Sequence, residues 1–224
     1  MTVKSKNPGF NGTPFIVCEI GASHNGSLER CLDLIGAAKK CGADAVKFQA
    51  FTPDTITLSC GAPEFIVQDG PWKGRQLYEL YSTAYTPREW FPTLFQTARD
   101  LGLVPFASVF SPEDCDFIMQ FDPEILKISS FEIIDLPLIE YVAKKGKPLF
   151  LSMGMTTDAE MWEALDTAVD AGIKALDLKV IQCTSSYPTL IQDAPLHLLK
   201  NRDGISDHSI GIEVPIAATA TRLV

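Results

Sequence analysis

Two lysines stand inside short apolar segments that have the composition of buried strands. Lys47 lies in the segment AVKFQ (45–49), and Lys127 lies in the segment 125–130. A buried lysine destabilises the folded protein unless it is paired with a negative charge or has a functional role, because its ammonium group loses its hydration. One such lysine is often an edge residue with a solvated tip, but two among apolar neighbours favour a functional role. An ammonium group held in this way is suited to binding phosphate.

Other polar residues stand at or just after the carboxyl ends of apolar segments. They are Glu19, Gln49, Ser108, Ser130, Ser152, Ser185, Tyr187, Ser206, Asp207 and His208. Serines at strand ends are commonly turn formers, and Glu19 could equally cap a loop or pair with a lysine. Gathered at one place, however, lysines, hydroxyls and backbone amides would form an anion site. Glu19 and His208 would add a carboxylate and an imidazole for proton transfer or metal binding.

The other two histidines are weaker candidates. His24 falls in the first predicted loop and could contact substrate, whereas His197 falls in a predicted helix and is expected at the surface. The phosphate-binding motifs GxGxxG and GxxxxGK[ST] are absent from the sequence. A small phosphorylated or carboxylated substrate is therefore expected, and not a nucleotide.

Alternating apolar and amphipathic segments predict the elements that position these residues. The predicted strands are 15–21, 45–49, 104–109, 125–130, 148–153, 176–184 and 204–208. The predicted helices are 27–41, 87–101 (with Thr86 as N-cap), 112–121, 136–145, 158–171, 194–201 and 214–223, and 50–86 is expected to be a long polar connection. Strict alternation is typical of parallel strands with crossover helices, in either a doubly wound sheet or a barrel. Polar residues at the ends of all seven strands favour an α/β barrel of the TIM (β/α)8 type, whose active site lies at that end.

Composition excludes several other classes of protein. The chain has 224 residues, 46% of them hydrophobic, and a net charge of −9, which argues against binding to nucleic acid or an anionic membrane surface. No stretch approaches the roughly 18–20 apolar residues of a membrane span. The six cysteines form no CxxC pair, so disulfides and structural zinc are not expected, and we predict reduced thiols in a cytoplasmic protein. Residues 1–14 are predicted to be a polar N-terminal segment without a secretory signal, and 15–224 a single barrel domain.

Six ordered motifs resemble the sialic-acid (N-acetylneuraminate) synthase family. They are EIGASHNG (19–26), GADAVKFQ (42–49), KISSFEI (127–133), LSMGM (151–155), QCTSSYP (182–188) and GISDHSIGIEVPIAA (204–218). The segments 65–90 and 130–148 look most like the pseudaminic-acid synthase branch. The resemblance implies that phosphoenolpyruvate condenses with an N-acetylated amino sugar to give a nonulosonic acid and phosphate. For this branch the implied sugar is a 2,4-diacetamido-2,4,6-trideoxy hexose in place of N-acetylmannosamine.

The resemblance also implies roles for particular residues. Lys47, Lys127, Ser130, Ser152 and Ser206 match positions that hold phosphoenolpyruvate, with Ser108 a further candidate. Gln49 and Tyr187 match positions near the sugar, and Ser185 and Asp207 are added from the same motifs as substrate-binding candidates. Glu19 matches an acidic residue near the reacting carbons, and His208 matches one of two histidines that bind a divalent metal, Mn²⁺ or Mg²⁺.

The sequence departs from the family pattern at several positions. Gln182 stands where histidine is common, Met153 where threonine is common, and Val109 where proline is common. An eighth strand and helix, the second metal histidine and a small C-terminal antifreeze-like domain are expected to be absent. Without an eighth strand, the first and seventh strands would each have an unpaired edge. Such open edges predict association into a homo-oligomer. The alternatives are a truncated paralogue that binds sugar or phosphoenolpyruvate without catalysis, and a class I aldolase in which Lys127 or Lys47 forms a Schiff base.

Overall fold

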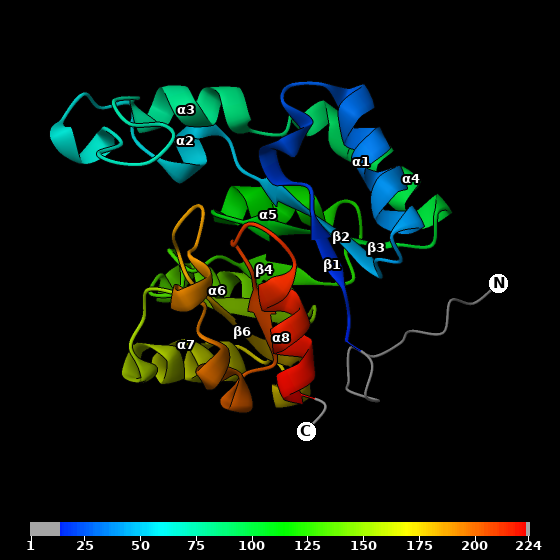
Figure 1. Ribbon diagram of the computed structural model, residues 1–224, viewed down its shortest axis with the longest axis vertical. Helices are drawn as coiled ribbons and strands as arrows, with labels where there is room; N and C mark the ends of the chain where they lie inside the picture. The colour runs from blue at the N-terminus through cyan, green and yellow to red at the C-terminus, as the bar shows by residue number, and fades with distance from the viewer. Residues whose placement is uncertain (1–13, 223–224) are drawn as a thin grey trace.

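Seven parallel strands form one curled sheet in the computed structural model, which describes residues 14–222 (Figure 1). The strands are β1 (Val17–Glu19), β2 (Ala45–Ala50), β3 (Val104–Val109), β4 (Leu126–Ile128), β5 (Leu149–Met153), β6 (Leu178–Cys183) and β7 (Gly204–Ser206). Each strand pairs with the next strand in the sequence, so the spatial order is β1 to β7. Sequential parallel pairing is the topology of a (β/α)8-type barrel, and the prediction of seven alternating strands in such a fold is confirmed.

Helices cover the outer face of the sheet, as crossover connections require. The α-helices are α1 (Leu28–Lys40), α2 (Pro53–Ile56), α3 (Leu77–Ala84), α4 (Phe91–Asp100), α5 (Pro112–Met119), α6 (Leu136–Ala143), α7 (Asp158–Asp170) and α8 (Glu213–Arg222). The 3₁₀ helices are η1 (Gly21–His24), η2 (Pro63–Phe65), η3 (Arg88–Trp90), η4 (Ala175–Asp177), η5 (Ile191–Asp193) and η6 (Leu196–Asn201). Within the described residues β1 and β7 each have one strand neighbour and are the two edges of the sheet.

The structure refines or corrects three predictions of local structure. The connection 50–86 contains α2, η2 and α3, and α2 begins at a capping box in which Thr52 and Thr55 bond each other's backbone amides. The predicted helix 194–201 is the 3₁₀ helix η6. Thr86 does not cap the following helix, because its hydroxyl is bonded to the buried ring of His24.

Two apolar layers hold the sheet in place. The larger layer lies between the strands and the helices and includes Phe48, Phe91, Phe95 and Ile118, all of which are buried. The smaller layer lies on the inner face of the sheet and consists of Ala45, Phe106, Ile125 and Phe150; we call it the floor. The floor fills the amino-terminal part of the barrel interior. A ligand could therefore bind only in the carboxyl-terminal part of the interior.

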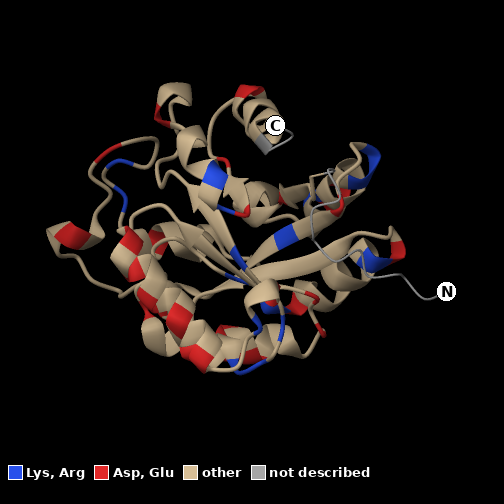
Figure 2. Cartoon of the chain, turned by 90° about the horizontal axis from the view of Figure 1, so that it is seen from below, with Lys and Arg blue, Asp and Glu red and all other residues tan. Residues whose placement is uncertain are grey.

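Charged residues are distributed unevenly between the sheet and its surroundings. Figure 2 shows basic residues on strands at the centre of the fold, while most acidic residues lie on the surrounding helices and loops. No helix among residues 14–222 is long and apolar enough to cross a membrane.

Candidate active site

The strand register places most of the predicted residues on one face of the sheet. Glu19 pairs with Lys47, Gln49 pairs with Ser108, and Ser108 pairs with Lys127. Paired residues of neighbouring parallel strands point to the same side. These side chains therefore all face the barrel interior at the carboxyl ends of the strands, a region that we call the mouth.

Lys47 is tied to two neighbours across the mouth. Its ammonium group forms an ion pair with Glu19 and donates a hydrogen bond of 3.3 Å to the Ser108 hydroxyl. Lys47 is buried, whereas the Glu19 side chain is 44% exposed. The pair joins β1, β2 and β3, and its carboxylate remains open to a ligand.

Gly21 allows the Glu19 carboxylate to lie beside the first loop. A side chain at Gly21 would place its Cβ 3.1 Å from Glu19 Oε1 and 3.6 Å from Gln49 Nε2. Gly21 also has φ = +42°, which favours glycine. Glu19 and Gln49 thus lie around the same bare backbone position, and the structure brings these two predicted residues together.

Lys127 lies on β4, the central strand of the sheet. Within residues 14–222 no hydrogen bond or ion pair holds its ammonium group. Burial, assisted by the positive charge of Lys47, lowers the pKa of Lys127 from 10.5 to about 7. An unpaired buried cation of this kind is a ready binding group for an anion, and the deprotonated amine that exists near neutral pH is a nucleophile.

Three serine hydroxyls lie at or just after the carboxyl ends of β4, β5 and β6. Ser130 and Ser185 bond each other through their hydroxyl oxygens at 2.6 Å, and Ser152 is buried with no hydrogen-bond partner for its hydroxyl. Gly154 makes the arrangement possible, because a Cβ there would lie 2.6 Å from Cys183 Sγ and would also collide with Ser185. The structure thus joins the hydroxyls that follow β4 and β6 beside the backbone that follows β5.

Glu132 is a candidate that the sequence analysis did not select. Burial raises its pKa from 4.5 to about 7, and its Oε2 atom is buried without a hydrogen-bond partner. The positive charge of Lys127 acts in the opposite direction, which places the two groups near each other. The available signal was its position two residues after Ser130 in the motif KISSFEI.

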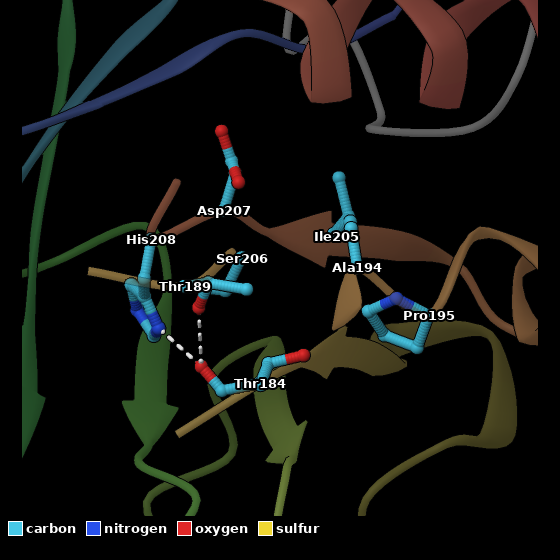
Figure 3. A pocket seen from close by; sticks show the side chains of 8 residues that line it. All are labelled: Thr184, Thr189, Ala194, Pro195, Ile205, Ser206, Asp207 and His208. Carbon is cyan, nitrogen blue, oxygen red and sulfur yellow. Dashed lines mark hydrogen bonds between the residues drawn. The ribbon is translucent and has the colours of Figure 1, made fainter. Parts of the chain in front are cut away.

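His208 has its two ring nitrogens in different environments (Figure 3). Nδ1 lies 2.8 Å from the Thr184 carbonyl oxygen, which can only accept, so Nδ1 donates. In the neutral ring Nε2 is then an acceptor, and it lies 3.3 Å from the Tyr187 hydroxyl, whose ring stacks on the imidazole with centroids 4.3 Å apart. Burial lowers the pKa of His208 and favours this neutral form.

The neighbours of His208 on β7 are arranged less uniformly. Ser206 lines the small pocket of Figure 3 together with His208 and Thr184. The Asp207 carboxylate points away from the imidazole and accepts hydrogen bonds from the Ser209 amide and hydroxyl. The structure thus brings Ser206 and His208 together but turns Asp207 to other partners.

His24 has a structural environment, contrary to the expectation that it could contact substrate. Its ring is fully buried and packs edge-on against Trp90, with centroids 5.3 Å apart. Nδ1 accepts from the Gly26 amide, so Nε2 donates to Thr86 at 3.2 Å. Both nitrogens are used to fix the first loop against the segment before α4.

Comparison with known proteins identifies the family. The sequence profile of the NeuB family matches residues 34–221. The chain belongs to the NeuB family. It is 43% identical to the pseudaminic acid synthase of Campylobacter jejuni and 39% identical to that of Helicobacter pylori, each over 213 residues. Both alignments cover 92% of this chain and 62% of the relative, so the chain spans about three-fifths of the length of the curated relatives that it matches.

A solved structure supports the fold assignment. The N-acetylneuraminic acid synthetase of Leptospira borgpetersenii, determined in complex with citrate, superposes with a TM-score of 0.78 at 27% sequence identity. The superposition covers 92% of this chain and 70% of that protein. The NeuB-family chain described here therefore has the barrel-type fold of a sugar-acid synthase, as its sequence motifs predicted.

Proposed function

We propose that this NeuB-family barrel binds phosphoenolpyruvate at its mouth and condenses it with an N-acetylated amino sugar to form a nonulosonic acid. The observation that carries the proposal is the unpaired, buried ammonium group of Lys127 next to Lys47 and the serine hydroxyls. Two lysines and several hydroxyls at a single site can neutralise a phosphate and a carboxylate together. The site holds its positive charge within a chain of net charge −9, so recognition depends on local contacts and not on long-range attraction.

The proposed reaction forms one carbon–carbon bond and breaks one carbon–oxygen bond. C3 of phosphoenolpyruvate attacks the aldehyde carbon of the open-chain sugar, and water adds to C2. The resulting tetrahedral intermediate loses phosphate by cleavage of its C–O bond. Lys47 and Lys127 stabilise negative charge on the departing phosphate, while Ser130, Ser152 and Ser206 orient it.

The half-exposed carboxylate of Glu19 lies at the same opening and is suited to proton transfer near the reacting carbons. Gln49 lies beside it and Tyr187 lies over His208, on the side where we place the sugar. We assign the amino sugar to the class used by pseudaminic acid synthases, because those relatives share 39–43% of aligned residues with this chain.

A divalent metal, Mn²⁺ or Mg²⁺, is a further part of the proposal. His208 fits the role of a ligand, because its Nδ1–H is held by the Thr184 carbonyl, and its Nε2 lone pair could bind a metal in place of its 3.3 Å contact with the Tyr187 hydroxyl. Among residues 14–222 no group of three or more acidic, histidine or cysteine side chains is arranged to hold a metal. We therefore expect His208 to share the ion with substrate, water or groups beyond the described residues. When bound, the metal would supply Lewis acidity at the sugar aldehyde.

Two wider properties belong to the proposal. All six cysteines are free thiols, which is typical of a protein in the reducing cytoplasm. The open edges of β1 and β7 would favour pairing with a second copy of the chain, and we therefore propose a homo-oligomer.

The test is release of phosphate from phosphoenolpyruvate in the presence of Mn²⁺ and the diacetamido sugar. We expect release by the wild-type chain and its loss in Lys127→Met, with Lys147→Met as a control because Lys147 forms an exposed ion pair with Asp122. Binding of phosphoenolpyruvate by calorimetry is measured in parallel. Binding without release would indicate the non-catalytic alternative, and no release with identical behaviour of His208→Ala would contradict the condensation.

The Schiff-base alternative draws on one specific observation. A pKa of about 7 gives Lys127 a large fraction of free amine at neutral pH, as a class I aldolase requires. Borohydride reduction in the presence of pyruvate, followed by mass spectrometry of the peptides around Lys127 and Lys47, separates the two chemistries. A trapped adduct on either lysine would overturn the condensation, and no adduct on either would remove the aldolase.

A further inference from the structure

We propose that Arg202 is a positioning residue that fixes the carboxyl ends of β5 and β6 through the side chain of Gln182. Arg202 lies between η6 and β7, and its side chain is only 11% exposed. Its Nε donates to Gln182 Oε1 at 3.2 Å, and its Nη2 donates to Asp158 Oδ1 at 3.0 Å. The effect of this arrangement on catalysis rests on the function proposed above.

Gln182 uses its whole amide group for contacts within the protein. Its Nε2 donates to the Met153 carbonyl at 2.7 Å and to the Cys183 carbonyl at 3.3 Å, while its oxygen accepts from Arg202. The residue on either side of it, Ile181 or Cys183, points to the opposite face of β6. Gln182 therefore lies outside the mouth and acts as a buried link between β5, β6 and Arg202.

Met153 connects the Gln182 side chain to the proposed anion site. It is the last residue of β5 and lies between Ser152, whose hydroxyl is unpartnered, and Gly154. Gly154 in turn packs against Ser185 and Cys183 so closely that a Cβ would not fit. A displacement of a few tenths of an ångström at Met153 would thus move the hydroxyls that we assign to phosphate binding.

Besides Gln182 and Asp158, the guanidinium of Arg202 donates a hydrogen bond of 3.2 Å to the Asn201 carbonyl. A cavity of about 460 Å³ lies beside it, lined in part by Trp162, Leu165 and Asn201. The Asp158 side chain is 81% exposed, so the ion pair alone contributes little to stability. Asp158 is nevertheless the first residue of α7, so the guanidinium connects the start of α7, the end of β6 and the loop before β7.

The experiment compares Arg202→Met with Arg202→Lys and with the matched control Arg99→Met. The guanidinium of Arg99 also connects separate segments by hydrogen bonds, to the carbonyls of Phe121 and Asp122, but Arg99 lies on α4 away from the mouth. At a temperature where all variants are folded, we expect Arg202→Met to weaken orthophosphate binding about fivefold to tenfold. We expect the KM for phosphoenolpyruvate to rise by a similar factor with little change in the KM for the sugar, and Arg202→Lys to restore part of the loss.

A second variant tests whether the effect passes through Gln182. Gln182→Glu keeps an acceptor for Arg202 but loses the donor to the Met153 carbonyl, so it should weaken orthophosphate binding as much as Arg202→Met. Combining Arg202→Met with Gln182→Glu should add less than the sum of the two effects. Fully additive effects, or an equal loss in Arg99→Met, would overturn the proposal.

Hydrogen–deuterium exchange of the amides at 149–155 and 178–185 gives a readout that does not depend on activity. We expect faster exchange in Arg202→Met than in the wild type and in Arg99→Met; unchanged exchange would overturn the positioning role. If the wild type bound no orthophosphate or phosphoenolpyruvate, the proposed function would fail, while the exchange result would still decide the role of Arg202.

Discussion

The floor and the mouth of the barrel interior are built on the same strands but differ in what they bury. At the floor, Phe106 and Phe150 pack ring against ring, with centroids 5.8 Å apart. In the strand register Lys47 pairs with Phe106, and Lys127 pairs with Phe150, so each lysine has an aromatic neighbour at its own level. The floor residues pack against one another, whereas within residues 14–222 the mouth contains a cation and a carboxyl oxygen without hydrogen-bond partners.

The difference shows that burial governs the electrostatic properties of the mouth. Burial is the main cause of the lowered pKa of Lys127 and of the raised pKa of Glu132. In this protein, stability and binding capacity therefore come from opposite ends of the interior. Changes at the floor should lower stability, whereas removing the buried charge of Lys127 or Glu132 at the mouth should raise stability.

The largest effect is expected at the floor. Phe106→Ala removes a fully buried ring and leaves a cavity, so the free energy of unfolding should fall by about 3–5 kcal/mol. Urea denaturation followed by circular dichroism measures the change. Phe131→Ala is the control, since Phe131 is 58% exposed and should change the free energy of unfolding by less than about 0.5 kcal/mol. Equal losses in the two variants would contradict the separation of floor and mouth.

Lys127→Met should change binding and stability in opposite directions. We expect phosphate release to fall about 100- to 1,000-fold, because a charge-stabilising group is lost. Below pH 7, burial of the protonated Lys127 lowers the free energy of unfolding by its full amount. This destabilisation decreases to zero as the pH rises towards 10.5. The stabilisation by Lys127→Met should therefore be largest below pH 7 and vanish near pH 10.5. Urea denaturation at several pH values tests this, and loss of stability at pH 6 would contradict it.

Glu132→Gln should also change stability at the mouth, but with a pH dependence opposite to that of Lys127→Met. The folded state favours the protonated form of Glu132. Ionisation of Glu132 therefore does not lower the free energy of unfolding below about pH 4.5, and lowers it by the full amount above pH 7. The variant should be more stable than the wild type by about 1–3 kcal/mol at pH 8 and nearly unchanged at pH 4.5. A pH-independent difference would contradict the raised pKa of Glu132 in the folded state. Exposed Glu140→Gln serves as the control.

Ser185→Ala should give the smallest effect. It removes the 2.6 Å hydrogen bond to Ser130 and should lower the free energy of unfolding by about 0.5–1.5 kcal/mol. Orthophosphate affinity should fall a few-fold, which calorimetry can measure. Ser82→Ala, which removes a bond within exposed α3, should leave that affinity unchanged. An unaltered affinity in Ser185→Ala would remove the serine pair from the anion site.

Much of the candidate site followed from the sequence, because its residues recur at the ends of predicted strands. Lys47, Ser108 and Lys127 were selected as polar residues in apolar segments, and the register confirms that they share a face. Glu132 was missed because it follows a strand in a loop, and its burial depends on chain segments far away in the sequence. Gln182 was read only as a departure from the family motif, since its partner Arg202 lies 20 residues further along the chain.

The sequence by itself determined the alternation of strands and helices and the placement of polar residues at strand ends. These features are local, because the period of apolar residues and the order of elements can be read within short windows. Tertiary structure alone decided the lack of a partner for Lys127, the tautomer of His208 and the structural use of His24. The pKa values and hydrogen bonds of these groups depend on atoms contributed by distant parts of the chain, which come together only when the sheet curls.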